Sequence, residues 1–162
     1  MQALRIFTTG GTIDKIYFDA QSEYEVGEPQ IGEILREMNV QLHFEITPLM
    51  RKDSLDMNDA DRARIRSAVA AAGENRIVIT HGTDTMTQTA AALAGIADKT
   101  IVLTGALNPA RFRGSDAMFN IGGALAAAQV APPGVYIYMN GRVFDARRVR
   151  KNRDRNRFED TA

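Results

Sequence analysis

The sequence predicts an α/β fold in which a parallel sheet lies between two layers of helices. Strand-like runs rich in Ile, Val, Phe and Tyr alternate with helical patterns over 162 residues, a length that suits one domain with a substantial core. The two central runs are continuously apolar, as parallel strands covered on both faces should be. Right-handed crossovers between such strands give a three-layer, flavodoxin-like sheet with helices on both faces. We therefore expect residues 1–162 to form a single domain.

Five segments are expected as strands of this sheet. They are Leu4–Thr8, a run within Gln41–Leu49, Arg76–His81, Thr100–Thr104 and Gly134–Met139. Residues 14–28 are too many for a plain strand-to-helix connection, and they contain two short strand-like pieces, Lys15–Phe18 and Tyr24–Val26. Because long structured loops in compact domains are often functional, we interpret this segment as an N-terminal hairpin flap over a site.

Four helices are expected between the strands. Their start signals are a first-turn proline, an N-cap asparagine, a Thr-Met-Thr-Gln capping box and a Ser-Asp pair. They are predicted over residues 31–38 behind Pro29, from Asn58 to about Ala72, from Thr85 to about Ala97, and from Ser115 to about Gln129.

Polar turns follow four of the predicted strands. Ligands of open α/β sheets bind outside the carboxyl ends of the strands. The four turns there are Thr8–Thr12, Lys52–Ser54, Thr80–Thr85 and Thr104–Ala106. Their polar groups are therefore expected to converge at one edge of the sheet.

Two of these turns place glycine and threonine directly after a strand. Glycine lets the backbone turn sharply and approach a ligand closely. A threonine on such a turn, as at Thr12 or Thr83, offers a hydroxyl nucleophile with backbone N–H groups beside it that can serve as an oxyanion hole. The two turns together predict a hydrolytic site built from two threonines.

Structural interpretations of the same residues remain open. Thr12 can satisfy the backbone at a turn, and Thr83 and Asp84 can cap the following helix. Because Thr85 already supplies a capping box, the side chains of Thr83 and Asp84 are not needed to cap the helix and are available for another role. His81 is expected to be structural, because a lone histidine at a strand end is more often a satisfied core residue than a catalyst. Purely structural roles are also open for the turn residue Ser54 and the aromatic Tyr24.

The composition excludes several classes of site. The formal net charge is zero, which gives no argument for nucleic-acid or membrane binding. The absence of cysteine excludes disulfides, thiolate metal sites and a cysteine nucleophile. With only two histidines, no metal or other cofactor is expected. Neither a signal-peptide pattern nor a long apolar run is visible, so we expect a cytoplasmic protein.

Two binding-module interpretations compete with the hydrolytic one. Residues 142–157 carry eight basic residues, and clustered arginines can follow phosphates. No RNA-binding signature or aromatic platform accompanies them, so no nucleic-acid partner is expected. The Thr8–Thr12 turn is also superficially similar to the phosphate loop of a flavodoxin-like small-ligand module. No tryptophan is available to stack on a flavin, and the second Gly-Thr motif would stay unexplained.

Seven groups of residues together are far more specific than any one of them. They are Thr9-Gly10-Gly11-Thr12-Ile13, Tyr24-Glu25-Val26-Gly27, Asp53-Ser54 with Asp56-Met57-Asn58-Asp59, Thr80-His81-Gly82-Thr83-Asp84-Thr85-Met86, Leu103-Thr104-Gly105-Ala106, Ser115-Asp116 with Phe119-Asn120, and Met139-Asn140 with Arg147–Lys151. In this order, the chain resembles the bacterial-type L-asparaginase family (asparaginase/glutaminase) over essentially its whole length, in a short form without the C-terminal domain. The two Gly-Thr motifs are the most specific part of the resemblance.

The resemblance implies conversion of L-asparagine to L-aspartate and ammonia through an acyl-enzyme. Thr12 would be the nucleophile, assisted by Tyr24 on the flap. Thr83, Asp84 and Lys151 would form a second polar cluster that activates Thr12 or the deacylating water. A threonine hydroxyl needs a positioned base, and a lysine can serve when burial disfavours its charged form. Which group accepts the first proton stays open.

The resemblance also implies how substrate is held. Ser54 would bind the α-carboxylate and Asp84 the α-ammonium, while backbone N–H groups of Gly11 and Thr83 would bind the oxyanion. Asp53 belongs to the same substrate-binding set. Hydrolysis of glutamine or another amide is the alternative within this chemistry, and the family also includes subunits of tRNA-linked amidotransferases.

Two departures from the family bear on affinity. Full-length members add a smaller second domain that completes the site across a dimer interface, and Leu55 stands where many members have glutamine. We therefore expect a homo-oligomer, a dimer or tetramer, with weaker substrate binding than two-domain members.

Overall fold

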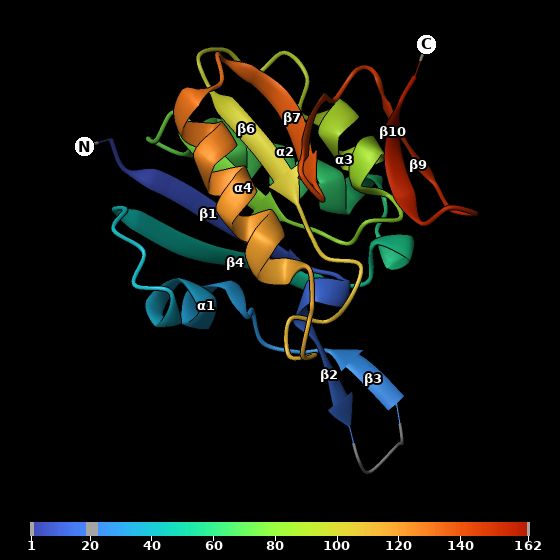
Figure 1. The fold of residues 1–162 in the computed structure, drawn as a ribbon. Coiled ribbons are helices and arrows are strands. Elements are labelled where there is room, and N and C mark those ends of the chain that lie inside the picture. Colours follow the sequence, from blue (N-terminus) through green and yellow to red (C-terminus); the bar gives the residue numbers. More distant parts are fainter. Residues whose placement is uncertain (1, 19–22, 162) are drawn as a thin grey trace.

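The computed structural model describes residues 2–18 and 23–161, and within them it has the predicted three-layer α/β fold (Figure 1). The central sheet has the strand order β4-β1-β5-β6-β7-β8. Its strands are β1 (Leu4–Gly10), β4 (Phe44–Lys52), β5 (Arg76–Thr80), β6 (Thr100–Thr104), β7 (Gly134–Met139) and β8 (Arg142–Asp145).

The first five of these strands are parallel, in the order of a flavodoxin-like sheet. Taken in chain order as strands one to five, they are arranged 2-1-3-4-5. The strand order reverses between β1 and β5, which pair in register from Leu4 with Arg76 to Thr8 with Thr80. Ligands bind at such a reversal, outside the carboxyl ends of the strands. The sixth strand, β8, was not predicted, and it pairs antiparallel with β7.

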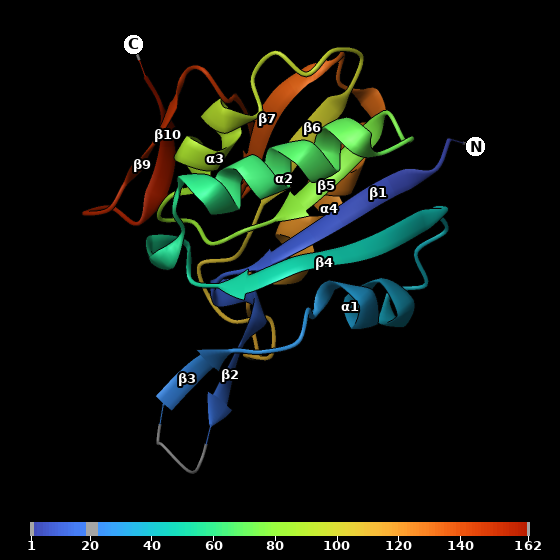
Figure 2. The ribbon, with the colours of Figure 1, turned by 180° about the vertical axis from the view of Figure 1, so that it is seen from behind.

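Helices cover both faces of the sheet, as Figures 1 and 2 show from opposite sides. One face carries α1 (Ile31–Glu37) and α4 (Ala117–Val130), and the other carries α2 (Asp59–Ala71) and α3 (Met86–Ala92). The strand β5 shows why both layers are needed. Its Val78 packs toward α4, whereas Ile77 and Ile79 pack toward α2 and α3, and all three are fully buried. Because successive side chains of a strand point to opposite faces, the apolar residues of β5 enter two separate cores, one on each face of the sheet.

The helix boundaries confirm the start signal of α2 and correct the others in detail. Pro29 lies before the N-cap Gln30, outside the first turn of α1, although the helix follows it closely. Asn58 caps α2 in a full capping box with Asp61. Thr85, by contrast, makes no capping hydrogen bond, and α3 ends at Ala92 rather than near Ala97. The helix α4 begins directly after Ser115-Asp116 as predicted, and Oγ of Ser115 accepts the N–H of its first residue, Ala117. The carboxylate of Asp116 does not cap α4, because it accepts hydrogen bonds from the backbone N–H groups of Leu107 and Asn108. The side chains of Thr85 and Asp116 thus bind tertiary partners instead of capping their helices.

Two hairpins lie outside the central sheet. The hairpin of the predicted flap is confirmed: β2 (Lys15–Phe18) pairs with β3 (Glu23–Val26), and the pair projects from the body of the molecule in Figure 1. Its role as a flap over the site stays a prediction. The basic C-terminal region forms β8 and a second hairpin, β9 (Val149–Asn152) with β10 (Arg157–Asp160). No helix among the described residues is long and apolar enough to cross a membrane.

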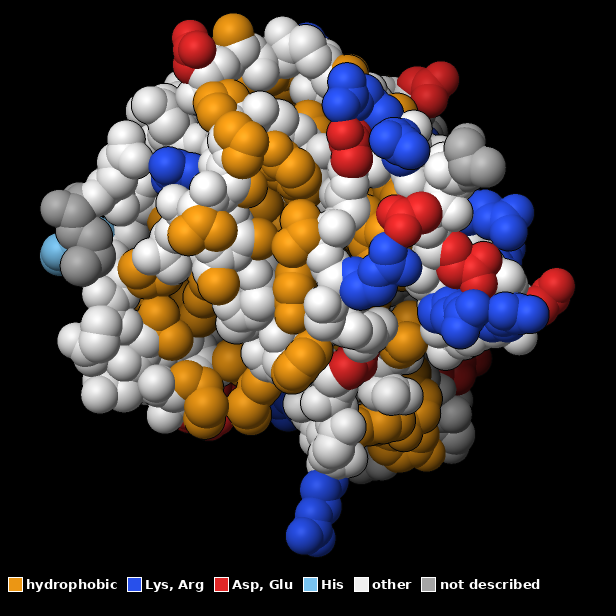
Figure 3. Space-filling view, turned by 45° about the horizontal axis from the view of Figure 1, so that its top comes forward, with side chains coloured by type: hydrophobic (Ala, Val, Ile, Leu, Met, Phe, Trp, Pro, Cys, Tyr) orange, Lys and Arg blue, Asp and Glu red, His pale blue; other side chains and the backbone are white. Residues whose placement is uncertain are grey.

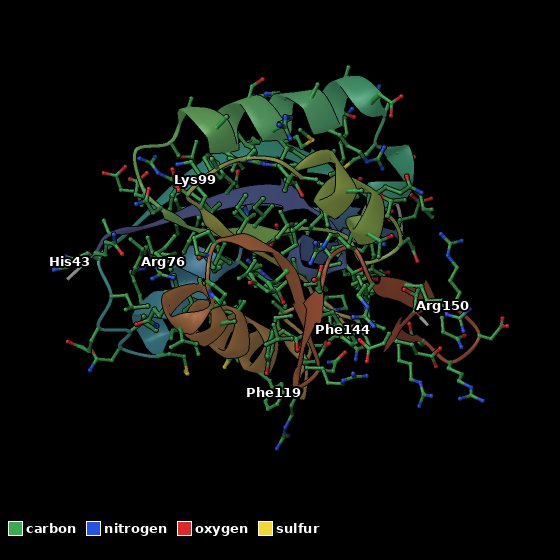
Figure 4. The ribbon with its side chains drawn as sticks, turned by 90° about the horizontal axis from the view of Figure 1, so that it is seen from above. His43, Arg76, Lys99, Phe119, Phe144 and Arg150 are labelled. Carbon is green, nitrogen blue, oxygen red and sulfur yellow. The ribbon has the colours of Figure 1, made fainter. Side chains whose placement is uncertain are left out.

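The amino ends of the strands are occupied by structural cations. Lys99 donates to the carbonyl oxygens of Ala72 and Glu74, and Arg76 donates to those of Ala128 and Ala131. These bonds satisfy backbone carbonyls where α2 and α4 end. Figure 4 shows these two cations at the opposite side of the molecule from Arg150 on β9. The Gly-Thr turns lie at the opposite end of the sheet, where the strands have their carboxyl ends.

Candidate active site

Gly11 and Gly82 allow the two Gly-Thr turns to approach each other closely at the carboxyl ends of β1 and β5. A Cβ on Gly11 would lie 2.4 Å from the backbone nitrogen of Gly82, and Gly11 also has a φ of +88°. Only glycine accommodates both the positive φ and this approach. Gly82 in turn leaves no room for a side chain against Ser54, whose Cβ would be 2.8 Å from an added Cβ. The turns of Thr12, Thr83 and Ser54 are thus in contact.

The turn that carries Thr12 is a single 3-10 turn, η1 (Thr12–Asp14), directly after β1. Thr12 is half-buried, which leaves its side chain accessible at the predicted edge. One prediction for this turn is wrong: the N–H of Gly11 donates to the carbonyl oxygen of Lys52 at 2.9 Å, which fixes β1 to the end of β4. Because that N–H is already used, it is not available to an oxyanion.

Lys151, Thr83 and Asp84 form a hydrogen-bonded cluster although they are far apart in sequence. The Nζ of Lys151 lies 2.7 Å from Oγ1 of Thr83 and 2.8 Å from Oδ1 of Asp84. The lysine side chain is only 11% exposed, because β9 lays it along the turn after β5. Arg153 also approaches Asp84, at 3.6 Å from Oδ1, but its side chain is largely exposed. The predicted second polar cluster therefore exists as a compact unit.

Ser54 is held rigidly beside this cluster. It begins the turn η2 (Ser54–Asp56), and its exposed fraction is 1%. Its Oγ accepts a hydrogen bond from the backbone N–H of Thr85 at 3.2 Å, and its carbonyl oxygen accepts one from the Thr85 hydroxyl at 2.8 Å. The Thr85 hydroxyl therefore joins η2 to the second Gly-Thr turn instead of capping α3. The hydroxyl proton of Ser54 is left to donate to another group.

Asp53 lies between two lysines of the site. It forms an ion pair with Lys15 of the flap, at 3.2 Å, and its Oδ1 accepts a hydrogen bond from the N–H of Leu55. Partial burial raises the pKa of Asp53, but the Leu55 N–H, Lys15 and the charge of Lys151 outweigh burial and lower it. Asp53 is therefore ionised at neutral pH and connects the flap to the cluster electrostatically.

His81 is structural, as the sequence analysis expected. Its ring is fully buried, with Nδ1 2.6 Å from the carbonyl oxygen of Gly82 and Nε2 2.7 Å from Oγ1 of Thr89. Burial lowers the pKa of His81 to about 4, so the ring is neutral at physiological pH. Because a carbonyl oxygen only accepts, Nδ1 carries the proton and Nε2 accepts from Thr89. The histidine thus braces the second Gly-Thr turn.

Tyr24 lies on the flap, and its described ring contacts are with other aromatic residues. Tyr24 is 51% exposed. The centroid of its ring lies 5.4 Å from that of Tyr17 and 5.5 Å from that of Phe112, which it meets edge-on. A cleft beside it runs between the flap and the end of β4, lined in part by Lys15, Lys52 and Asp53. Tyr24 therefore lines this cleft, and among the described residues its hydroxyl makes no hydrogen bond to Thr12.

Asp14 is the residue of this region that the sequence analysis missed. It lies two residues after Thr12 and is 2% exposed, with its Oδ1 bound by the backbone N–H of Gln30 at 2.9 Å. Its other oxygen, Oδ2, is buried without a hydrogen-bond partner. No local pattern in Thr12-Ile13-Asp14-Lys15 marks Asp14 as a buried residue.

The basic C-terminal region is extensively paired with carboxylates. Glu159 contacts Arg150, Arg155 and Arg157, and Arg147 pairs with Asp145. Figure 3 shows basic and acidic side chains side by side on the right of the molecule, where β9 and β10 lie. Such interspersed charges do not form the continuous positive track that a nucleic-acid backbone requires. No group of His, Asp or Glu in the described part of the chain is arranged to hold a metal ion.

Fold and site together define an α/β protein with a Thr-Lys-Asp cluster and a second Gly-Thr turn at the reversal of a flavodoxin-like sheet. Residues 3–159 match the family described as "Asparaginase, N-terminal". The chain belongs to this asparaginase family.

Relatives and solved structures agree with the assignment. The probable periplasmic L-asparaginase of Haemophilus influenzae is 32% identical over 91% of this chain and 46% of its own length. The thermostable L-asparaginase from Thermococcus kodakarensis superposes with a TM-score of 0.84 at 28% identity, covering 98% of this chain and 51% of that one. L-asparaginase I from Vibrio cholerae gives a TM-score of 0.84 at 29% identity, with the same coverages. The chain spans about half the length of these proteins.

Proposed function

We propose that this chain hydrolyses the side-chain amide of L-asparagine, with Thr12 as nucleophile, to give L-aspartate and ammonia. The observation that carries the proposal is the Lys151 amine within 2.8 Å of both Thr83 and Asp84. That cluster adjoins the Thr12 turn through the contact of Gly11 with Gly82. Family membership supports the reaction class.

The first half-reaction forms an ester. The Thr12 hydroxyl loses its proton to a base and its oxygen attacks the amide carbon, which gives a tetrahedral oxyanion. Collapse of this intermediate breaks the C–N bond, and the nitrogen leaves as ammonia after gaining a proton. The N–H of Thr83 is the remaining candidate of the two predicted oxyanion donors, because that of Gly11 is bound to Lys52.

The second half-reaction returns the free enzyme. Water loses a proton to a base as its oxygen attacks the ester carbon, and the Thr12 oxygen leaves and recovers a proton. We assign the base role to the Lys151–Thr83–Asp84 cluster, because its hydrogen bonds form a continuous path for a proton. Tyr24 is assigned to flap closure over the cleft that its ring borders.

Substrate binding is assigned to the carboxylates and hydroxyl around the cleft. Ser54 retains a hydroxyl proton to donate to the α-carboxylate, and Asp84, 32% exposed, accepts from the α-ammonium. We assign to Asp53 a second negative charge near the ammonium, and its position beside the cleft, paired with Lys15, supports this assignment. Leu55 is 58% exposed beside Ser54 and offers no polar contact. We further propose a cytoplasmic homo-oligomer, in which a second copy covers this open side.

Ammonia release from L-asparagine and L-glutamine, measured side by side with the purified chain, tests the proposal. We expect asparagine to be hydrolysed and glutamine to be handled poorly, because its amide carbon lies one methylene further from Ser54 and Asp84. A misplacement of about 1 Å costs about 100-fold in rate. Release from neither amide would contradict the proposal, and equal rates would show that the site is not set for the shorter side chain.

A further inference from the structure

Asp14 is a buried titratable group that the proposed mechanism does not use, and it lies where three parts of the site meet. Its N–H donates to the carbonyl oxygen of Gly11 at 3.1 Å, which closes the turn of Thr12. Its carbonyl oxygen accepts from the N–H of Gly27 at 2.8 Å, which closes the base of the flap. Its Oδ1 accepts from the N–H of Gln30 immediately before α1. One residue thus joins the nucleophile turn, both stems of the flap and α1.

A further path leads from Asp14 to the ring of Tyr24. Gln30, itself 6% exposed, accepts a hydrogen bond from Nε of Arg111 at 3.1 Å. The next residue, Phe112, is the edge-on partner of Tyr24. The contact between Asp14 and Gln30 therefore belongs to a chain of contacts that ends at the flap aromatic residue.

The base of the flap leaves little space for adjustment. A Cβ on Gly27 would lie 3.0 Å from Cδ1 of Ile16 and 3.4 Å from the carbonyl oxygen of Asp14. With Oδ2 buried and unpartnered, an ionised Asp14 would hold a negative charge without a hydrogen bond on that oxygen. Such a charge is costly unless water or a cation reaches it, and neither can do so without loosening this packing.

The cations near Asp14 are engaged with other partners. Arg51 of β4 pairs with Glu28 of the segment before α1, Lys15 of β2 pairs with Asp53, and Arg111 of the loop before α4 donates to Gln30. Burial raises the pKa of Asp14 to about 7, against the smaller opposing effects of the Gln30 N–H and the Arg51 charge. The carboxyl group of Asp14 therefore loses its proton near neutral pH.

We propose that Asp14 is a positioning residue: its protonated carboxyl group fixes the base of the flap to the Thr12 turn and α1, which keeps Tyr24 in its place on the flap, and its ionisation loosens this base. The effect on catalysis rests on the function proposed above, whereas the movement of the flap does not. Asn at position 14 keeps an oxygen for the Gln30 N–H but carries no charge at any pH. Asp14→Asn therefore fixes the held state.

The ring signals of the tyrosines report the flap directly by nuclear magnetic resonance. Of the four tyrosines, Tyr17 and Tyr24 lie on the flap, and Tyr136 and Tyr138 on β7 serve as internal references. The titration runs from about pH 5.5 to about pH 8.5, which lies below the pH of about 10 at which free tyrosine ionises. In the wild type we expect the Tyr24 signals to shift with a midpoint near the pKa of Asp14, about 7, and in Asp14→Asn to stay constant.

Steady-state kinetics supplies the catalytic half of the test. The ratio of kcat/KM of Asp14→Asn to that of the wild type should rise severalfold between about pH 6 and about pH 8.5, because only the wild type loses the held state. Asp98→Asn is the matched control: Asp98 is exposed on the turn before β6 with a φ of +60°, which Asn also adopts, and its ratio should stay flat.

The outcomes separate this inference from the proposed function. If neither amide is hydrolysed but the Tyr24 signals follow pH only when Asp14 is present, the function is wrong and the flap inference stands. If the Tyr24 signals shift equally in wild type and Asp14→Asn, or do not shift in the wild type, the inference is overturned. A purely structural role for Asp14 would lower activity by the same factor at every pH, which also overturns it.

Discussion

Two buried titratable residues, Asp14 and His81, act on stability in opposite directions. Asp14 keeps its proton to about pH 7 in the folded chain, whereas in the unfolded chain it loses it near pH 4. Its contribution to stability therefore falls as pH rises from about 4 to about 7. The pKa of His81 is lowered to about 4, so the unfolded chain binds its proton first as pH falls below about 6.5. Its contribution therefore rises with pH over much of the same window.

Asp14→Asn is predicted to remove the first effect and uncover the second. The free energy of unfolding should equal that of the wild type near pH 4 and exceed it by up to about 4 kcal/mol above pH 7, since one pKa unit corresponds to about 1.4 kcal/mol. The variant's own stability should rise from about pH 4 to about pH 6.5, through His81. Urea denaturation at a series of pH values measures both slopes. An unchanged difference between the two proteins from pH 4 to 8 would contradict the assignment to Asp14.

At the scale of single residues, the sequence predicts chemistry well where a motif fixes it. Thr83, Asp84 and Lys151 converge as the resemblance implied, although Lys151 is one of several neighbouring cations and nothing local distinguishes it. Asp14 escaped prediction because its role depends on the Gln30 N–H and on the depth of burial, both of which arise only in the folded chain. The oxyanion role of the Gly11 N–H was wrong for a similar reason: β4 supplies the Lys52 carbonyl as its partner.

At the scale of elements, β9 and the turn after β5 are predicted to act as one catalytic unit. Groups that share one proton path are not additive when they are removed together. The double variant Thr83→Val with Lys151→Met should therefore be little slower than either single variant. Losses that multiply would contradict a shared path. Lys151→Arg should also fail, because arginine cannot release its proton.

Arg150→Met is the control for these element-scale variants. Arg150 precedes Lys151 on β9, but its side chain is exposed and pairs with Glu159 at 3.4 Å. Figure 4 shows it on the hairpin at the right-hand side of the molecule. Because exposed ion pairs contribute at most about 1 kcal/mol, its removal should leave kcat/KM and the unfolding midpoint close to wild type. Loss of activity comparable with that of Lys151→Met would show that charge on the hairpin, rather than the lysine itself, supports turnover.

The presence of most helices and strands was predictable from the sequence, whereas some of their boundaries were not. Continuous apolar runs gave β5 and β6, and the capping box at Asn58 gave the start of α2. The capping box expected at Thr85 failed because a long-range partner, the Ser54 carbonyl, takes its hydroxyl. The strand β8 was missed although a local signal was present: Asn140 and Gly141, both with positive φ, form the two-residue turn that pairs it with β7.

At the scale of the whole molecule, the exposure of the site predicts weak substrate binding by an isolated chain. Asp84, Lys15 and Asp53 are each about a third exposed, so water screens every charged contact to substrate. We expect a homo-oligomer that covers this side, and apparent affinity that rises with protein concentration in the range where the oligomer forms. Light scattering together with saturation curves for asparagine at several enzyme concentrations checks this. A monomer with tight, concentration-independent saturation would show that the chain completes its own site.

The overall architecture was predictable because every level of the sequence agrees on it. The apolar periodicity, the alternation of strands and helices and the position of the Gly-Thr turns all predict polar groups at one edge of a parallel sheet. The hairpin follows from the length of the segment between β1 and α1. The arrangement of the C-terminal basic region was not predictable in the same way. Its charges are partnered by carboxylates that come together only through the β9–β10 pairing and the turn at Asp145.

The central claim is that Thr12 is the nucleophile, and replacement of its hydroxyl tests it most directly. Ammonia release from asparagine should be compared for the wild type, Thr12→Ala and Thr12→Ser, with unfolding midpoints confirming that all three are folded. We predict that Thr12→Ala loses on the order of 1000-fold or more in kcat, while Thr12→Ser, which keeps a hydroxyl, retains measurable turnover. A folded Thr12→Ala protein that keeps about a tenth or more of wild-type turnover would contradict the account.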